Sequence, residues 1–373
     1  MSKPVYTPPA SVKSASSLRR QVVRVAQLPL AAAVSLGAGV PWAVAQTTNG
    51  TVITTLSGSA ATQTLINSPQ VGLKTVTTTT LRDGNAFNNF SQFQVGNGDT
   101  VKLVVPTGAN WLVNVVRDGR VQVDGVLQSR LGSDAGAVGG NLLFIDRHGF
   151  GVGPNGRIDT GRLSFAAPST TFVDAMLASG PGLSANQVTG ILSGQFERSS
   201  TGSVRIEGEI NARDGVQIMA GQGQDAAQAV SVTGRVVVGG RAAGSAVNLG
   251  DLRSLNPVVE RDGVIDITTP GDVLLNGKLL ADASHWNQAG GVRVVAGGDV
   301  ALGGQALVSA TAALGSGGQG GQVSLFAHGS ASNAAGATLA AIWFIGQFHG
   351  VIRVHTPMGS RRISVVPIAY SKA

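Results

Sequence analysis

The stretch that decides the fold is Ile265-Asp266-Ile267 together with Gly271-Asp272-Val273-Leu274-Leu275-Asn276-Gly277. A second copy follows at an offset of 27 residues, as Val292-Arg293-Val294 and Gly298-Asp299-Val300-Ala301-Leu302-Gly303-Gly304. The first three residues of each copy alternate aliphatic with charged side chains, and each copy ends in glycine, which is typical of short strands joined by tight turns. An internal repeat of this length indicates an array of similar structural units.

The repeat extends beyond these two copies. Further matches are the pairs Ala281 with Val308 and Ala283 with Ala310, a third copy from Val323, and weaker copies from Val204 and Val216. The third copy needs additional residues, which fit in the glycine-rich loop 314–321. We therefore expect shaft-like repeats of about 27 residues over 241–341.

Short strands of this kind cannot each bury an apolar face alone, but they can when they are stacked as coils, each adding about 4.8 Å along an axis. A low aromatic content of 5 % and 53 glycines suit a narrow core with sharp corners. An immunoglobulin-like sandwich is the competing all-β fold, but it predicts no repeat of this length. The sequence predicts an all-β fold, a right-handed parallel β-helix (solenoid).

Residues 168–200 depart from the strand pattern. Phe172, Ala175 and Met176 fall on one helical face, with Thr170 or Thr171 as the N-cap. The stretch Ser184-Ala185-Asn186-Gln187 is typical of a capping box. We expect a short helical excursion near 169–192, beside the stack.

Composition and charge exclude several kinds of site. There is no cysteine, so disulfides, thiolate metal sites and cysteine nucleophiles are excluded. The net charge is +7, but nine basic residues lie in 1–45 and 342–373, which contain no acidic residue. The other 296 residues carry 18 basic and 20 acidic side chains. This balance gives no basic excess for a polyanion, and we expect no nucleic-acid partner.

The first 45 residues resemble an export signal. Arg19, Arg20 and Arg24 precede the apolar stretch 28–40, which is too short to span a bilayer because a spanning helix needs about 20 residues. Ala43 and Ala45 are small, as signal peptidase requires, so cleavage is expected before Gln46. The sequence thus predicts a signal peptide with a long n-region over 1–45 and use of the general secretion machinery.

Four segments together carry a family resemblance. They are Asn85-Ala86-Phe87-Asn88-Asn89-Phe90-Ser91-Gln92-Phe93-Gln94-Val95, Ala109-Asn110-Trp111-Leu112-Val113-Asn114-Val115-Val116, 140–153 and Gly156-Arg157-Ile158-Asp159-Thr160-Gly161-Arg162-Leu163. In order and spacing, 46–240 resembles the amino-terminal secretion domain of two-partner-secretion exoproteins of the filamentous-haemagglutinin type, and most resembles the leukotoxin-like filamentous adhesin branch.

The resemblance implies a β-helix with an N-terminal strand cap. It also implies recognition in the periplasm by an outer-membrane barrel transporter with periplasmic repeat domains. The expected location is the cell surface or medium of a Gram-negative bacterium, where an adhesin of this kind would meet a host-cell glycan or protein receptor. The resemblance implies no catalytic residue, metal or cofactor.

One element of the family falls on Asp146-Arg147-His148-Gly149-Phe150. The leukotoxin-like branch tends to Asp-Pro-His-Gly-Phe here, so Arg147 stands in place of proline. The resemblance makes these five residues, with Asn110 and Asn114, the candidates for transporter recognition. From the residues alone, Asp146 can cap its own turn and Gly149 permits a sharp corner. Phe87, Phe90 and Phe93 are expected to pack as a cap.

Two other functions stay open. Parallel β-helices include polysaccharide lyases and hydrolases, which need clustered carboxylates or a basic group on one outer face. The nearest to such a cluster are Asp266, Asp272, Asp282 and Asp299, of which Asp272 and Asp299 are expected to stack as a turn ladder. The second alternative is the N-terminal delivery part of a contact-dependent toxin.

After Ala341 the pattern changes, because Ile342-Trp343-Phe344-Ile345-Gly346-Gln347-Phe348 and the stretch that follows do not continue the repeat. We interpret 342–373 as an atypical tail from an interrupted reading frame.

Overall fold

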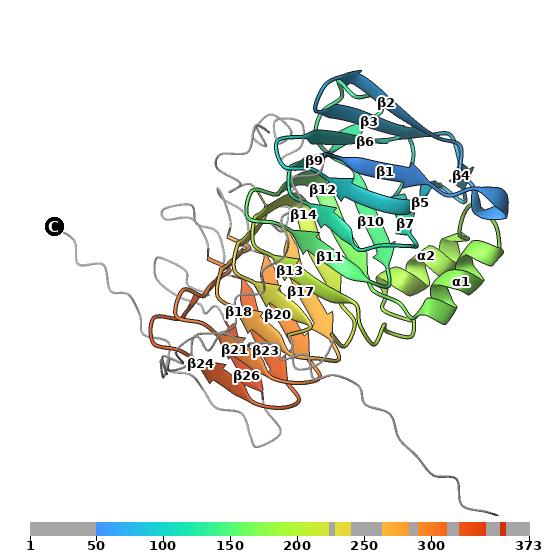
Figure 1. Cartoon of the computed structure of the whole chain (residues 1–373). Coiled ribbons are helices and arrows are strands. Elements are labelled where there is room, and N and C mark those ends of the chain that lie inside the picture. The colour runs from blue at the N-terminus through green and yellow to red at the C-terminus, as the bar shows by residue number, and fades with distance from the viewer. Residues whose placement is uncertain are drawn as a thin grey trace, which may run out of the picture. The chain divides into compact units, whose positions relative to one another are not determined.

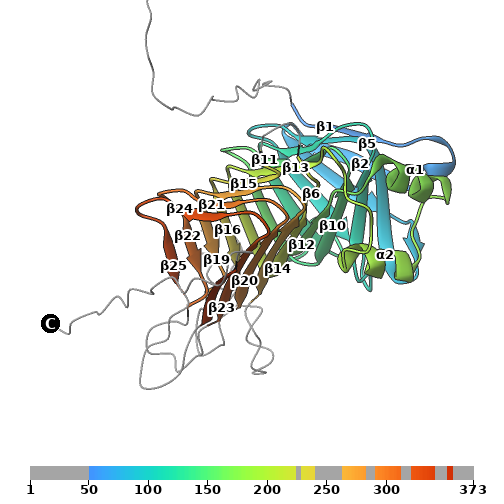
Figure 2. The same cartoon turned by 90° about the horizontal axis from the view of Figure 1, so that it is seen from below.

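The computed structural model describes residues 50–223, 228–239, 263–282, 290–311 and 321–340, and the backbone of the strand at 351–355. Successive strands run around an axis and pair with those of the coils before and after, which gives a parallel β-helix (Figures 1 and 2). Three columns of parallel strands form its walls. In each coil the chain passes from the first column to the second and then to the third, and it returns to the first column in the next coil.

The first column contains the copies quoted above. Ile265 pairs with Val292 and Val292 with Val323, so the third copy is confirmed, and Val216 pairs with Ile265. The strands of this column are β5 (Asn85–Val95), β7 (Leu112–Val116), β10 (Asn141–Asp146), β12 (Arg157–Ala166), β14 (Glu209–Met219), β17 (Val264–Thr269), β20 (Gly291–Ala296), β23 (Gln322–Ala327) and β26 (Val351–His355).

The second column corrects one expectation. Val204 pairs with Val230, which pairs with Val273, so the copy from Val204 belongs here and not beside Ile265. The first rung of this column is the end of β5, where Gln94 and Val95 pair with β8. The strands that follow are β8 (Val121–Val123), β11 (Gly149–Val152), β13 (Ser203–Ile206), β15 (Val230–Val232), β18 (Val273–Leu275), β21 (Val300–Leu302) and β24 (Ala331–Asn333).

The third column corrects a second expectation, the pairing of Ala281 with Val308. Leu279, not Ala281, pairs with Val308, because the corner after Leu302 is two residues longer than the corner after Leu275. Ala283 lies outside the described residues. This column consists of β3 (Leu73–Thr78), β6 (Thr100–Val105), β9 (Val126–Leu131), the first halves of β12 and β14, β16 (Arg235–Val238), β19 (Lys278–Leu280), β22 (Leu307–Ser309) and β25 (Thr338–Ala340).

An antiparallel cap covers the first coils, as expected. The strand β1 (Val52–Thr55) and the short β4 (Leu81–Arg82) pair with β5, and β2 (Thr64–Gln70) forms a hairpin with β3. A 3-10 turn, η1 (Gly58–Ala60), follows β1. Such strands close an end that would otherwise present unpaired edges to other chains.

The core is a continuous column of Val, Ile and Leu side chains inside the coils. At the capped end it contains five rings, from Phe90 and Phe93 through Phe144 and Phe150 to Phe165, with successive centroids 5.1–5.9 Å apart. Phe87, Phe90 and Phe93 are all buried, but only Phe90 and Phe93 lie in this column. Phe87 belongs to a separate apolar cluster with Val113 and Leu143, so the three rings do not form one packed cap. Rings at these separations attract each other beyond their burial of apolar area.

The helical excursion is confirmed, with two corrections. The helices are α1 (Thr170–Ala178) and α2 (Ala185–Leu192), and α2 has the expected capping box on Ser184 and Gln187. The N-cap of α1 is Ser169, because its hydroxyl accepts the Phe172 amide hydrogen. Its buried face is Val173, Met176 and Leu177, whereas Ala175 is exposed. Both helices pack on the outer side of the first column, against Val113, Leu143 and Ile145.

One strand of the tail is described. Val351–His355 pairs in parallel with β23 as one more rung of the first column. The other tail residues lie outside the described residues. The origin of 342–373 stays a prediction.

Candidate functional site

The predicted recognition element forms the corner between β10 and β11. Asp146 is completely buried. Its Oδ1 accepts hydrogen bonds from the His148 backbone amide at 2.8 Å and from His148 Nδ1 at 3.1 Å. Its Oδ2 accepts one from the Val121 amide at 2.7 Å, in the preceding coil. Asp146 therefore caps its own turn, as expected, and also joins two coils.

The electrostatics of this corner depend on burial. Burial raises the pKa of the Asp146 carboxyl, and hydrogen bonds from His148 and Val121 act in the opposite direction. Arg147 Nε donates to His148 Nε2 at 3.2 Å, so His148 Nδ1 carries the hydrogen that Asp146 accepts. The His148 side chain is 34 % exposed and Arg147 is partly exposed, so these two side chains face solvent.

Gly149 and Phe150 complete the corner from inside. Gly149 has a φ of +111°, and a Cβ there would collide with the Ser203 carbonyl oxygen of the next coil. Only glycine fits such a conformation without strain. The Phe150 ring belongs to the aromatic column, and its carbonyl oxygen accepts a 2.7 Å hydrogen bond from Arg120 Nη2. Burial lowers the pKa of Arg120 to about 10.

The two asparagine candidates lie elsewhere. Asn110 is exposed in the loop before β7, whereas the corner begins beside the other end of that strand, where Asp146 pairs with Val116. Asn114 is completely buried, and its Oδ1 accepts a 3.0 Å hydrogen bond from Asn88 Nδ2. Asn114 is therefore part of a polar ladder within the folded domain. The cleavage candidates Ala43, Ala45 and Gln46 lie outside the described residues.

The carboxylates considered for catalysis all bond within the solenoid. Asp272 Oδ1 accepts the Asp299 amide hydrogen at 2.7 Å, and Asp299 Oδ1 accepts that of Ser330 at 2.6 Å, which confirms the turn ladder. Asp266 pairs with Arg293 at 3.1 Å. Asp282 is buried and accepts a hydrogen bond from the Thr311 amide at 2.7 Å. Each of these four carboxylates therefore has a structural role, in which it joins neighbouring coils.

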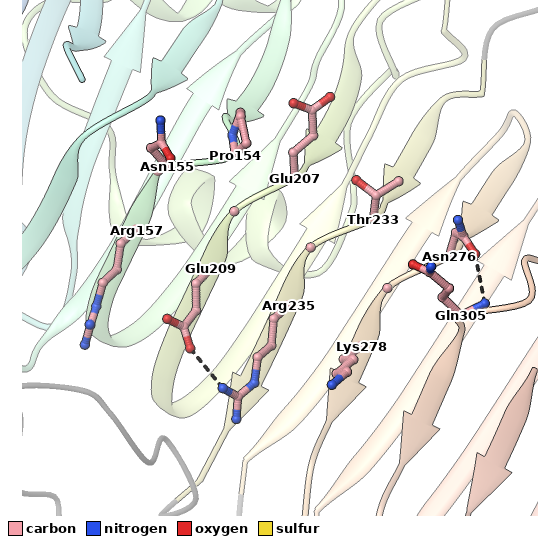
Figure 3. A pocket seen from close by; sticks show the side chains of 14 residues that line it. Pro154, Asn155, Arg157, Glu207, Glu209, Thr233, Arg235, Asn276, Lys278 and Gln305 are labelled. Carbon is pink, nitrogen blue, oxygen red and sulfur yellow. Dashed lines mark hydrogen bonds and ion pairs between the residues drawn. The ribbon is translucent and has the colours of Figure 1, made fainter. Parts of the chain in front are cut away.

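A groove that the sequence did not indicate runs along the corners between the second and third columns (Figure 3). Its volume is about 540 Å³, and it crosses five successive coils from Pro154 to Gln305. Polar side chains line both sides, and glycines lie between them. The sequence does contain a signal for this groove, because a glycine followed by a charged residue occurs at Gly156, Gly208, Gly234 and Gly277. Corners that stack in register bring these residues together.

Within the described ranges, no helix is long and apolar enough to cross a membrane. The same part of the chain has no group of three His, Asp or Glu side chains placed to hold a metal ion.

Comparison with solved structures finds chains of similar fold, among them a secretion domain. The crystal structure of the HMW1 secretion domain from Haemophilus influenzae superposes with a TM-score of 0.39 and 12 % identity, over 78 % of this chain and 73 % of that chain. No protein-family model matches the sequence. No curated protein matches it.

Proposed function

We propose that this chain is a secreted, filamentous-haemagglutinin-like adhesin fragment whose N-terminal domain is recognised by an outer-membrane two-partner-secretion transporter. One observation carries the proposal: the four segments that resemble that family form β5, β7, β10 with β11, and β12. These stack as successive coils immediately behind the cap. Segments that are separate in sequence thus belong to one end of one structure.

The proposal assigns roles to the candidate residues. The signal peptide 1–45 directs the chain to the general secretion machinery, and signal peptidase cuts before Gln46. In the periplasm the barrel's repeat domains contact the corner at Arg147 and His148, the members of the recognition element that face solvent. Asp146, Gly149 and Phe150 shape that corner from within. The released protein then meets a host-cell glycan or protein at the bacterial surface.

Co-expression of the full chain with an outer-membrane two-partner-secretion barrel from the same organism tests this export route. We expect release into the medium only when the barrel is present, and an N-terminus at Gln46 in the released protein. The double variant Arg147→Ala/His148→Ala should reduce release at least about five-fold and accumulate in the periplasm. Because the variant also loses the hydrogen bond from His148 to the buried Asp146, circular dichroism of the purified protein must show that it is still folded.

A matched control is Arg162→Ala/His328→Ala, which removes the same two side-chain types at exposed positions elsewhere on the solenoid. Equal release of the two double variants would refute the assigned corner. Release without the barrel would refute the transporter.

A further inference from the structure

The groove between the second and third columns has a floor made of backbone. At Gly156, Gly208, Gly234 and Gly277 a Cβ would collide with a carbonyl oxygen of the preceding coil, so the corners stack too closely for any side chain. Each corner repeats once per coil, about 4.8 Å from the next. The result is a straight trough with an even repeat, parallel to the solenoid axis (Figure 3).

Two rows of polar side chains flank this floor. One row carries amide, hydroxyl and carboxylate groups, on Asn155, Glu207, Thr233, Asn276 and Gln305. The other is the outward-facing start of the third-column strands, where Arg157, Glu209, Arg235 and Lys278 are neighbours in register. The lining contains no aromatic and no large aliphatic side chain.

The charges in the groove nearly cancel. Three cations and two carboxylates line it, and Glu209 pairs with Arg235 at 3.3 Å. Glu207 is exposed in the first row, between Asn155 and Thr233, where it would repel a polyanion. Planar amide, carboxylate and guanidinium groups can each form paired hydrogen bonds with neighbouring hydroxyls. This set of groups suits a ligand rich in hydroxyls and without net charge.

We propose that the groove binds an extended, uncharged polysaccharide that lies along the solenoid axis with one sugar facing each coil. Equatorially linked pyranose units advance by a distance similar to one coil, so one sugar meets each corner and alternate sugars present the same hydroxyls to the groove. An extended peptide advances about 3.3 Å per residue and loses this register within a few coils. The glycine floor lets the sugar rings approach the backbone. Binding at this groove does not depend on the export route proposed above.

Titration of the purified full chain with cellohexaose and chitohexaose, followed by calorimetry, tests the proposal. We expect saturable binding of at least one of these neutral hexasaccharides and weaker binding of hexagalacturonate, which has the same length but six carboxylates. The variant Glu207→Ala/Lys278→Ala removes one exposed carboxylate and one exposed cation from the groove. It should raise Kd at least about ten-fold at unchanged thermal stability.

The control is Lys74→Ala/Asp134→Ala, which removes the same charges from positions outside the groove and should change Kd less than about two-fold. Three results would overturn the inference: no saturable binding of either neutral probe, tighter binding of hexagalacturonate, or equal Kd values for the two double variants. None of them bears on release by the transporter, so the two proposals fail separately.

Discussion

At the scale of single residues, Asp146 shows how a buried carboxylate can shape a corner. It accepts two hydrogen bonds from His148 and one from Val121 of the coil before it. Burial disfavours its charged form, while these donors favour it, and burial is the larger effect on its pKa. The pKa of Asp146 in the folded protein is therefore above its usual value of 3.8.

The sign of this shift gives a pH prediction. Because the folded pKa is raised, the contribution of Asp146 to the free energy of unfolding is fully present below pH 3.8 and declines as pH rises through the folded pKa. Asp146→Asn should cost about 1–3 kcal/mol, since a buried partner is lost. The stability advantage of the wild type over this variant should shrink as pH rises. Urea unfolding at pH 4, 5.5 and 7 measures it.

Asp118 is the internal control. It is hydrogen-bonded to Arg117, which lowers its pKa, so its contribution is present above pH 3.8 and is lost as pH falls through the folded pKa. The advantage over Asp118→Asn should therefore grow as pH rises. If the stability advantage of the wild type grew with pH for both variants, the hydrogen bonds of Asp146 would have a larger effect on its pKa than its burial has.

At the scale of elements, the sequence predicted the columns wherever corner lengths stay constant. The pairs Ile265 with Val292 and Val273 with Val300 follow directly from the 27-residue offset. The prediction failed at β22 because two extra residues at the preceding corner shift the register. It also misassigned Val204, because strands of different columns share one alternating pattern.

The candidate site was predictable only in part, for a similar reason. The turn at Asp146 follows from local residue types, since aspartate and glycine favour corners. The burial of Asn114 depends on Asn88 of the preceding coil, which no local pattern reveals. The groove depends on five corners in register.

The capping box of α2 provides a test at this scale. Ser184 Oγ accepts the Gln187 amide hydrogen at 3.3 Å, and Gln187 Oε1 accepts the Ser184 amide hydrogen at 2.8 Å. Ser184→Ala should lower the free energy of unfolding by about 1 kcal/mol, as is typical of a lost N-cap. Urea denaturation monitored by circular dichroism measures this change. Ser57→Ala should have little effect, because the Ser57 side chain makes no capping hydrogen bond at η1. Equal losses would contradict the assigned role of Ser184.

At the scale of the whole molecule, the solenoid is unequal along its axis. The capped end has the aromatic column and a second apolar cluster under the helices. The later coils are filled by small and medium aliphatic side chains such as Val294 and Leu325. In a stack of nearest-neighbour units, coils with less buried area open at lower free energy.

Two core truncations should separate these regions. Phe144→Ala removes the ring between Phe93 and Phe150 and should cost about 3–5 kcal/mol, with loss of amide protection throughout the capped end. Leu325→Ala, in a late coil, should accelerate hydrogen exchange in β20 to β23 and leave β5 to β12 protected. Hydrogen exchange followed by mass spectrometry measures both. Uniform loss of protection in Leu325→Ala would indicate one cooperative unit.

The carboxylate ladder at the corners has a direction. Each aspartate accepts the amide hydrogen of the following coil, from Asp272 to Asp299 and from Asp299 to Ser330. A completed coil thus presents a carboxylate oxygen to the backbone amide of the stretch of chain that follows it, as Asp272 does for Asp299 and Asp299 for Ser330. If a polypeptide emerged through a pore with its amino-terminal end already folded, it would fold one coil at a time. Each folded coil would then oppose movement of the chain back through the pore.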